Sequence, residues 1–200
     1  KYVELFCDNQ ALTIDKMYDF VFSENSLFID EGRNLLITEF GKNYGTYFSI
    51  LSEIANGHYT QGEIESALGG TAIGGYLSKL ENVYNLITRE RPIFAKPGTK
   101  KNVRYVIGDN FLNFWFKYIE QNRSYIELQN FDDLRQLAKA DYPTYSGKVL
   151  EKYFKQKLAE TGGFKEIGSW WETKSSIGKQ RINSYEIDIV ALKSSGKKAL

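Results

Sequence analysis

The sequence predicts an α+β protein, and two patterns lead to this class. Apolar residues recur at the spacing of an amphipathic helix in segments such as "YGTYFSILSEIANG", residues 44–57. Short runs with strand character, "LITRERPI" and "VRYVI", follow these helical segments. Helices and strands that are grouped along the chain in this way are typical of the α+β class.

The composition is that of an ordinary globular chain. Its 200 residues are enough for one or two compact domains, and 26% of them are charged. A net charge of +1 gives no global argument for binding nucleic acid, so such binding depends on local clusters of Lys and Arg. The single Cys7 excludes an internal disulfide and indicates a reducing, cytoplasmic location, and Cys7 and the lone His58 are too few soft ligands for zinc. No apolar run reaches the roughly 18 residues that a membrane-spanning helix needs.

Both ends of the chain lie inside a regular pattern. Lys1 opens an amphipathic helical segment that covers residues 1–40, and Leu200 closes the chain within a strand-like pattern. We therefore expect a piece of a longer polypeptide, in which this first segment precedes two domains, 41–120 and 121–200. We expect the boundary between these domains within residues 120–140, where the composition changes.

The middle domain has the order of elements of a winged helix-turn-helix. One helix ends at Gly57, and a second begins at a capping box formed by Thr60 and Glu63. A third helix follows in "TAIGGYLSKLENVYNLI", and two strands joined by the basic turn "AKPGTKKN" come after it. Three helices followed by a basic hairpin predict a winged helix-turn-helix with a β-hairpin wing.

The predicted wing carries an excess of positive charge. Only Glu90 opposes its cations, and each cation that neutralises a phosphate favours binding by releasing counterions. The candidate phosphate-binding residues are Arg89, Arg91, Lys96, Lys100, Lys101 and Arg104. A solvated hairpin that binds nothing is the alternative, because loops rich in Lys and Gly are common.

The third helix would read DNA bases if this domain enters the major groove. Its candidate contact residues near the start are Thr71, Ser78 and Lys79. None of these is an Arg or Asn that could make a bidentate contact with a base edge. The sequence therefore favours binding of nucleic acid shape and backbone, or contact with a protein, over sequence-specific reading.

The C-terminal domain contains a candidate acidic site. We expect a helix from about residue 145 to 160, followed by strands in "KEIGSWWETK" and "SYEIDIVAL". A period of two puts Glu186 and Asp188 on one face of the second strand, at the border of a core. Carboxylates in such a place need a cation, and hard divalent metals take oxygen ligands. Glu151 on the helix either pairs with Lys155 or points at this site.

Four stretches together resemble the C-terminal half of the archaeal-type AAA-like ATPases: "YFSILSEIANGHYTQGEIESALGG", "RYVIGDNFLNFWFKYI", "GKVLEKYF" and "EIDIVAL". The most specific part is Y-x-I-x-D-x-F-L-x-F-W-F, at residues 105–116. In that family an ATPase core and its helical lid precede a winged helix and a domain similar to the PD-(D/E)XK restriction-endonuclease-like nucleases. The resemblance makes residues 1–40 the end of the lid and residues 121–200 a truncated α/β restriction-endonuclease-like module.

This resemblance implies roles for the acidic residues. Glu151 matches the acid on the first helix of the nuclease core, Asp188 matches the metal-binding Asp, and Glu186 is its neighbour. Mg²⁺ would be held by Asp188 and Glu151. The family's Glu-x-Lys does not follow Asp188 in these residues, and no G-x-x-x-x-G-K-[ST] loop occurs, so ATP is expected only in an upstream domain. We therefore expect that this chain alone neither hydrolyses ATP nor cleaves DNA, and the acids could equally be remnants of a degenerate nuclease fold.

Three functions follow as expectations. The first is a regulatory, nucleic-acid-binding region of an ATPase, with DNA and the upstream ATPase domain of the same polypeptide as partners. The second is a protein-interaction module in which "FLNFWF" packs the winged helix on the lid and transmits nucleotide state without DNA contact. The third is that the full-length protein is a Mg²⁺-dependent DNA nuclease, which is a family-level analogy.

Overall fold

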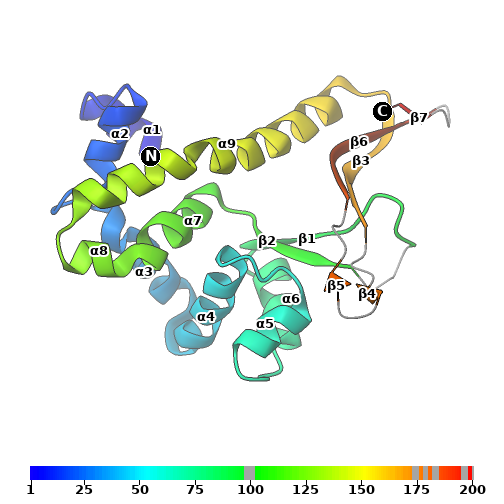
Figure 1. Cartoon of the computed structure of the whole chain (residues 1–200), viewed down its shortest axis with the longest axis horizontal. Coiled ribbons are helices and arrows are strands. Elements are labelled where there is room, and N and C mark those ends of the chain that lie inside the picture. The colour runs from blue at the N-terminus through cyan, green and yellow to red at the C-terminus, as the bar shows by residue number, and fades with distance from the viewer. Residues whose placement is uncertain (97–101, 173–175, 178–179, 182–184, 195–197, 200) are drawn as a thin grey trace. The chain divides into compact units, whose positions relative to one another are not determined.

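The computed structural model describes the chain apart from residues 97–101, 173–175, 178–179, 182–184, 195–197 and 200 (Figure 1). Helices make up most of the described residues, and the strands form small hairpins, so the predicted α+β class is confirmed. Within the described part, no helix has both the length and the apolar character that crossing a membrane requires.

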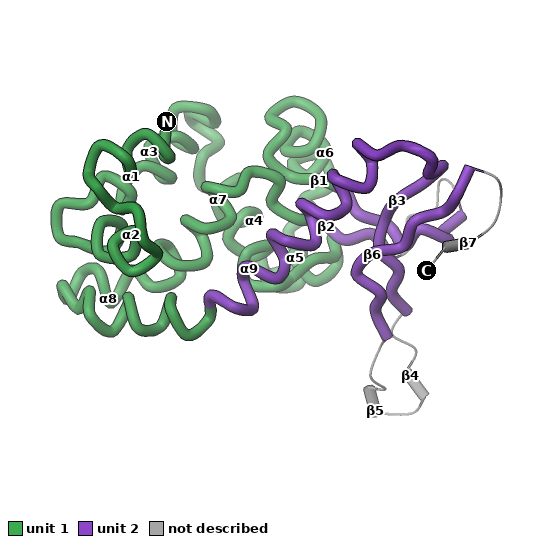
Figure 2. Tube along the Cα trace, turned by 90° about the horizontal axis from the view of Figure 1, so that it is seen from above, with its two compact units in different colours: residues 1–88, 105–141 green, residues 89–104, 142–200 purple. Residues whose placement is uncertain are grey.

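The chain divides into two compact units, which Figure 2 colours green and purple. Unit 1 contains Lys1–Thr88 and Tyr105–Asp141, and unit 2 contains Arg89–Arg104 and Tyr142–Leu200. Residues 89–104, the predicted wing, are therefore grouped with the C-terminal residues.

The described part of unit 1 is mainly helical and includes two short 3-10 stretches, η1 and η3, and a π-helical turn, η2. Its elements up to the hairpin are α1 (Tyr2–Asp8), α2 (Ile14–Val21), α3 (Phe28–Phe40), η1 (Gly41–Asn43), α4 (Tyr44–Ala55), α5 (Gln61–Ala67) and α6 (Gly74–Asn82). The elements after it are α7 (Asn110–Phe114), η2 (Trp115–Ile119), the 3-10 turn η3 (Glu120–Asn122) and α8 (Arg123–Glu127).

The three helices predicted for the middle domain are confirmed as α4, α5 and α6. The Thr60 side chain accepts a hydrogen bond from the Glu63 backbone, and the Glu63 carboxylate accepts one from the Thr60 backbone, so the capping box is also confirmed. Strand β1 (Ile87–Glu90) then pairs with β2 (Arg104–Ile107). The Tyr105 N–H donates to the Tyr59 carbonyl at 2.7 Å, which ties the start of β2 to the turn before α5.

The core of unit 1 is aromatic, and Trp115 lies at its centre. The indole is fully buried, and its Nε1 donates to the Ile29 carbonyl at 3.1 Å. Gly32 on α3 is required by this contact, because a Cβ there would lie 2.5 Å from the Trp115 Cγ. The segment "FLNFWF" thus packs on residues 1–40, as the rings of Tyr2 and Phe111 also show by stacking at 4.5 Å.

Helix α9 (Phe131–Thr161) begins earlier than the sequence indicated. The prediction of a start near residue 145 was wrong because only Leu134 and Ala138, one turn apart, are buried in its first part. Such a narrow apolar stripe gives little periodic signal, and Pro143 lies inside the helix, where it would usually break the pattern.

The sheet of unit 2 is built on a twisted antiparallel pair of strands, β3 (Phe164–Trp171) and β6 (Glu186–Lys193), which lie side by side in Figure 1. Strand β7 (Lys198–Ala199) pairs with β6, while β4 (Ser176–Ile177) pairs with β5 (Gln180–Arg181). Both pairs are antiparallel.

The register of β3 and β6 shifts at Ser169. Gly168 lies opposite Val190 and Trp170 opposite Ile187, so Ser169 faces both Asp188 and Ile189. An extra residue in one strand interrupts the alternation of side chains. The strict period of two predicted for this strand is therefore interrupted between Ile187 and Val190. Asp188 is exposed, and Val190 is buried.

Candidate nucleic-acid interface and acidic cluster

Residues 89–96, the basic segment, begin in the second half of β1 and are fastened to β3. The buried Ile93 donates its N–H to the Ser169 carbonyl at 2.8 Å, and its side chain packs against Gly168. The Ala95 N–H closes a turn onto the Pro92 carbonyl at 2.8 Å. This anchoring leaves three cations of the segment exposed: Arg89, Arg91 and Lys96.

Arg104 has a different environment from these cations. Its Nη1 donates to the Glu186 Oε1 at 2.7 Å, and its guanidinium lies 4.2 Å from the centre of the Trp171 ring. Arg104 thus has an anionic and an aromatic partner within unit 2. The two remaining predicted cations, Lys100 and Lys101, lie outside the described residues.

The predicted contact residues of the third helix lie in unit 1. Thr71, Ser78 and Lys79 are all exposed. The Thr71 hydroxyl donates to the Leu68 carbonyl at 3.0 Å, which ties it to the end of α5. Ser78 and Lys79 lie on α6, which buries Leu77 and Leu80 and leaves these polar side chains toward solvent.

The three predicted acids lie in the electrostatic field of one lysine. Lys148 on α9 pairs with Glu151 one turn later, with 3.1 Å between Nζ and Oε1. Burial lowers the pKa of Lys148, but the hydrogen bond and charge of Glu151, with the charges of Asp188 and Glu186, outweigh it and raise the pKa overall. Of the three acids, Glu151 is the one that forms an ion pair with Lys148.

The pairing of Glu151 with Lys155 considered from the sequence does not occur. Lys155 instead donates to the Ser169 hydroxyl at 2.6 Å, and that hydroxyl donates to the Asp188 carbonyl at 3.0 Å. Helix α9 and both strands are thus linked at the register shift. The Glu151 side chain is 23% exposed and pairs with Lys148, and its role as a site residue stays a prediction.

The described residues contain no group of three His, Cys, Asp or Glu side chains that could hold a metal ion. Asp188 is exposed, and Glu186 is paired with Arg104. Mg²⁺ held by Glu151 and Asp188 remains a prediction from the resemblance.

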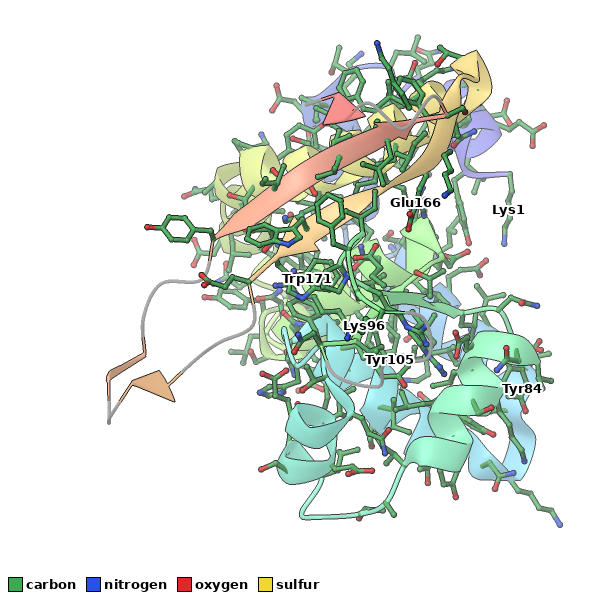
Figure 3. The ribbon with its side chains drawn as sticks, turned by 90° about the vertical axis from the view of Figure 1, so that its right-hand side faces the viewer. Lys1, Tyr84, Lys96, Tyr105, Glu166 and Trp171 are labelled. Carbon is green, nitrogen blue, oxygen red and sulfur yellow. The ribbon has the colours of Figure 1, made fainter. Side chains whose placement is uncertain are left out.

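Sequence reasoning missed an aromatic hollow beside the basic segment. This hollow has a volume of about 240 Å³, and Phe94, Trp170, Trp171 and Asn102 are among the residues that line it. Lys96 and Trp171 are both labelled in Figure 3, which shows this side of the molecule. The available signal was the "WW" pair in a strand together with the single Phe of the basic segment, but tertiary contacts such as the one between Ile93 and Ser169 bring the two together.

Comparison with known proteins identifies relatives without an assigned function. The chain is 39% identical over 164 residues to the uncharacterized protein MJECL04 of Methanocaldococcus jannaschii, a match that covers 78% of this chain. The match covers 34% of the relative, so the chain spans about a third of its length. No solved structure matches the sequence. Residues 115–200 match the model of DUF234, a family described as archaea bacterial proteins of unknown function.

Proposed function

We propose that this chain is a nucleic-acid-binding region whose basic segment contacts phosphates. The carrying observation is that Arg89, Arg91 and Lys96 are exposed on a segment that buried residues fasten to β3. A fixed backbone presents the cations without the entropy cost of ordering a loop on binding. Each phosphate that they neutralise releases condensed counterions, which favours binding.

Removing these charges tests the proposal. We expect the double variant Arg91→Ala/Lys96→Ala to bind a labelled oligonucleotide about tenfold more weakly than the unchanged chain at low salt. The matched control is Lys165→Ala/Lys193→Ala, which removes the same charge from the end of the β3–β6 pair away from Trp171. Equal affinities of the two double variants, measured by fluorescence anisotropy, would contradict the proposal.

We further propose that α4, α5, α6 and the β1–β2 hairpin form a winged helix. The order of these elements and the hydrogen bond from Tyr105 to Tyr59 support this assignment. Thr71, Ser78 and Lys79 would then contact nucleic acid through backbone and shape, with DNA as the candidate partner. The variant Lys79→Ala should weaken binding by the same factor on unrelated sequences, and a loss confined to one sequence would contradict backbone contact.

The nuclease-like reading of the C-terminal residues is also a proposal. Its support is that Glu151 pairs with Lys148, and that the charges of Asp188 and Glu186 also raise the pKa of Lys148. Mg²⁺ would there polarise a phosphate and activate water. Because no Glu-x-Lys follows Asp188, we expect no plasmid cleavage by this chain with Mg²⁺ or Mn²⁺. Nicking that depends on metal and is lost in Asp188→Ala would refute this expectation.

The place of this chain within a longer ATPase remains a proposal as well. It rests on the resemblance and on the much greater length of the M. jannaschii relative. The competing interaction module gains support from Leu150, Tyr153 and Phe154, large apolar side chains that α9 exposes at helical spacing. An affinity for nucleic acid that changes neither with salt concentration nor in the Arg91→Ala/Lys96→Ala variant would favour that alternative.

A further inference from the structure

We propose that the aromatic hollow of unit 2 is a stacking site for an unpaired nucleobase, so that the preferred ligand is single-stranded nucleic acid. This inference rests on the proposed function, because the basic segment supplies the phosphate contacts. To the proposed phosphate contacts it adds a ligand class, single-stranded nucleic acid, and a site for one of its bases. The hollow has a volume of about 240 Å³ and is lined by Phe94, Trp170 and Trp171 with Pro92, Asn102 and Glu172.

Phe94 is held in an exposed position by its neighbours in the chain. Pro92 and Ile93 are buried, and the hydrogen bonds from Ile93 to Ser169 and from Ala95 to Pro92 fix the turn. Phe94 nevertheless leaves 52% of its surface exposed. A large ring held at the surface in this way loses little entropy when a flat ligand stacks on it.

The two tryptophans have different roles in the hollow. Trp171 is buried, and Arg104 covers one face of its ring, so it forms a fixed wall. Trp170 is half-buried and lies opposite Ile187 in the strand pair. The geometry therefore offers Phe94 and Trp170 as the rings on which a base can stack.

The charges beside the hollow select the ligand. Arg91 and Lys96, both exposed, immediately flank the turn that carries Phe94. Aromatic side chains next to cations that follow a phosphate backbone are the combination that binds single strands. A base within a duplex has its faces covered by its neighbours, so only an unpaired base can enter. Asn102 and Glu172 provide polar groups for the edge of such a base.

The test compares a single-stranded oligothymidylate with an abasic strand of the same length, which keeps the phosphates and removes the bases. Binding is followed by the quenching of tryptophan fluorescence and by anisotropy. We expect the strand with bases to bind about tenfold more tightly than the abasic strand. Phe94→Ala should abolish that difference, and Phe94→Tyr should retain it.

The control for Phe94→Ala is Phe154→Ala, which removes the same side chain at nearly equal exposure, 51%, from α9 of the same unit. It should leave the preference for bases unchanged. Equal binding of the two strands that still depends on Arg91 and Lys96 would overturn the stacking site and leave the proposed function standing. Absence of binding to either strand would overturn the proposed function and the stacking site together.

Discussion

The two units differ in how many of their large aromatic side chains they leave exposed. In unit 1, Trp115, Phe116 and Tyr118 are almost entirely removed from solvent. Unit 2 leaves Phe94 and Phe154 half exposed, although burying such a ring contributes about 1.5–3 kcal/mol to stability. We therefore expect substitutions in the core of unit 1 to lower the free energy of unfolding. Substitutions of the exposed rings and cations of unit 2 should instead weaken the binding of nucleic acid.

The largest expected effect breaks the close packing of unit 1. Gly32→Ala puts a Cβ against the Trp115 indole, and we expect a loss of about 3 kcal/mol in unfolding free energy because a packed core resists added volume. Urea denaturation monitored by circular dichroism measures this loss.

Gly147→Ala is the matched change in unit 2. Gly147 lies within α9, and its added Cβ would meet nothing within 4 Å. We expect this variant to gain about 0.5–1 kcal/mol from helix propensity and from a less flexible unfolded chain. If Gly32→Ala and Gly147→Ala lost the same unfolding free energy, the difference in packing between these two positions would be contradicted.

A smaller effect comes from a polar contact at the edge of the unit 1 core. Asp141 Oδ2 accepts from the Tyr118 hydroxyl at 2.5 Å and pairs with Lys117 Nζ at 2.6 Å. Burial raises the pKa of Asp141, but the hydrogen bonds from Lys117 and Tyr118 outweigh it and lower the pKa overall. We expect Asp141→Asn to lose about 1.5 kcal/mol at neutral pH, since a hydrogen bond to a charged group is removed.

The pH dependence of this effect has a definite sign. A lowered pKa in the folded state stabilises the protein above the ordinary Asp value of about 4, and this contribution is lost as the pH falls through the lowered pKa. The stability difference between the unchanged chain and Asp141→Asn should therefore narrow below pH 4. Urea midpoints of both proteins measured from pH 7 to pH 2.5 test this. A stability difference that stays constant over this range would show that the ionised Asp141 carboxylate is not its source.

The smallest stability effect concerns Arg104, whose partners lie within unit 2. A double-mutant cycle with Arg104→Ala and Glu186→Gln should give a coupling of about 0.5–1 kcal/mol, because the pair is partly exposed. Arg104→Ala should change the salt dependence of nucleic-acid binding less than Arg91→Ala does. A larger effect of Arg104→Ala than of Arg91→Ala on the salt dependence would show that Arg104 contacts phosphate.

Local signals in the sequence were sufficient for part of the fold. The helices α4, α5 and α6 and the capping box of Thr60 and Glu63 depend on residues a few positions apart, and all were predicted. The first turns of α9 were missed because a stripe as narrow as Leu134 and Ala138 is a weak signal.

The candidate sites depended more on tertiary contacts. The sequence indicated the acids but not the register shift beside Asp188, nor the pairing of Glu151 with Lys148. It also missed the hollow, because Phe94 and Trp170 lie far apart in sequence and are brought together by tertiary contacts such as that of Ile93 with β3. Side chains from separate segments carry no periodic signal that links them.

The salt dependence of binding to a single-stranded oligonucleotide tests the central claim most directly. A plot of the logarithm of the association constant against the logarithm of the salt concentration should fall steeply for the unchanged chain. Its slope should become shallower by about 0.7 for each of Arg91 and Lys96 that is replaced by Ala. A slope that Arg91→Ala/Lys96→Ala leaves unchanged would contradict phosphate binding by the basic segment.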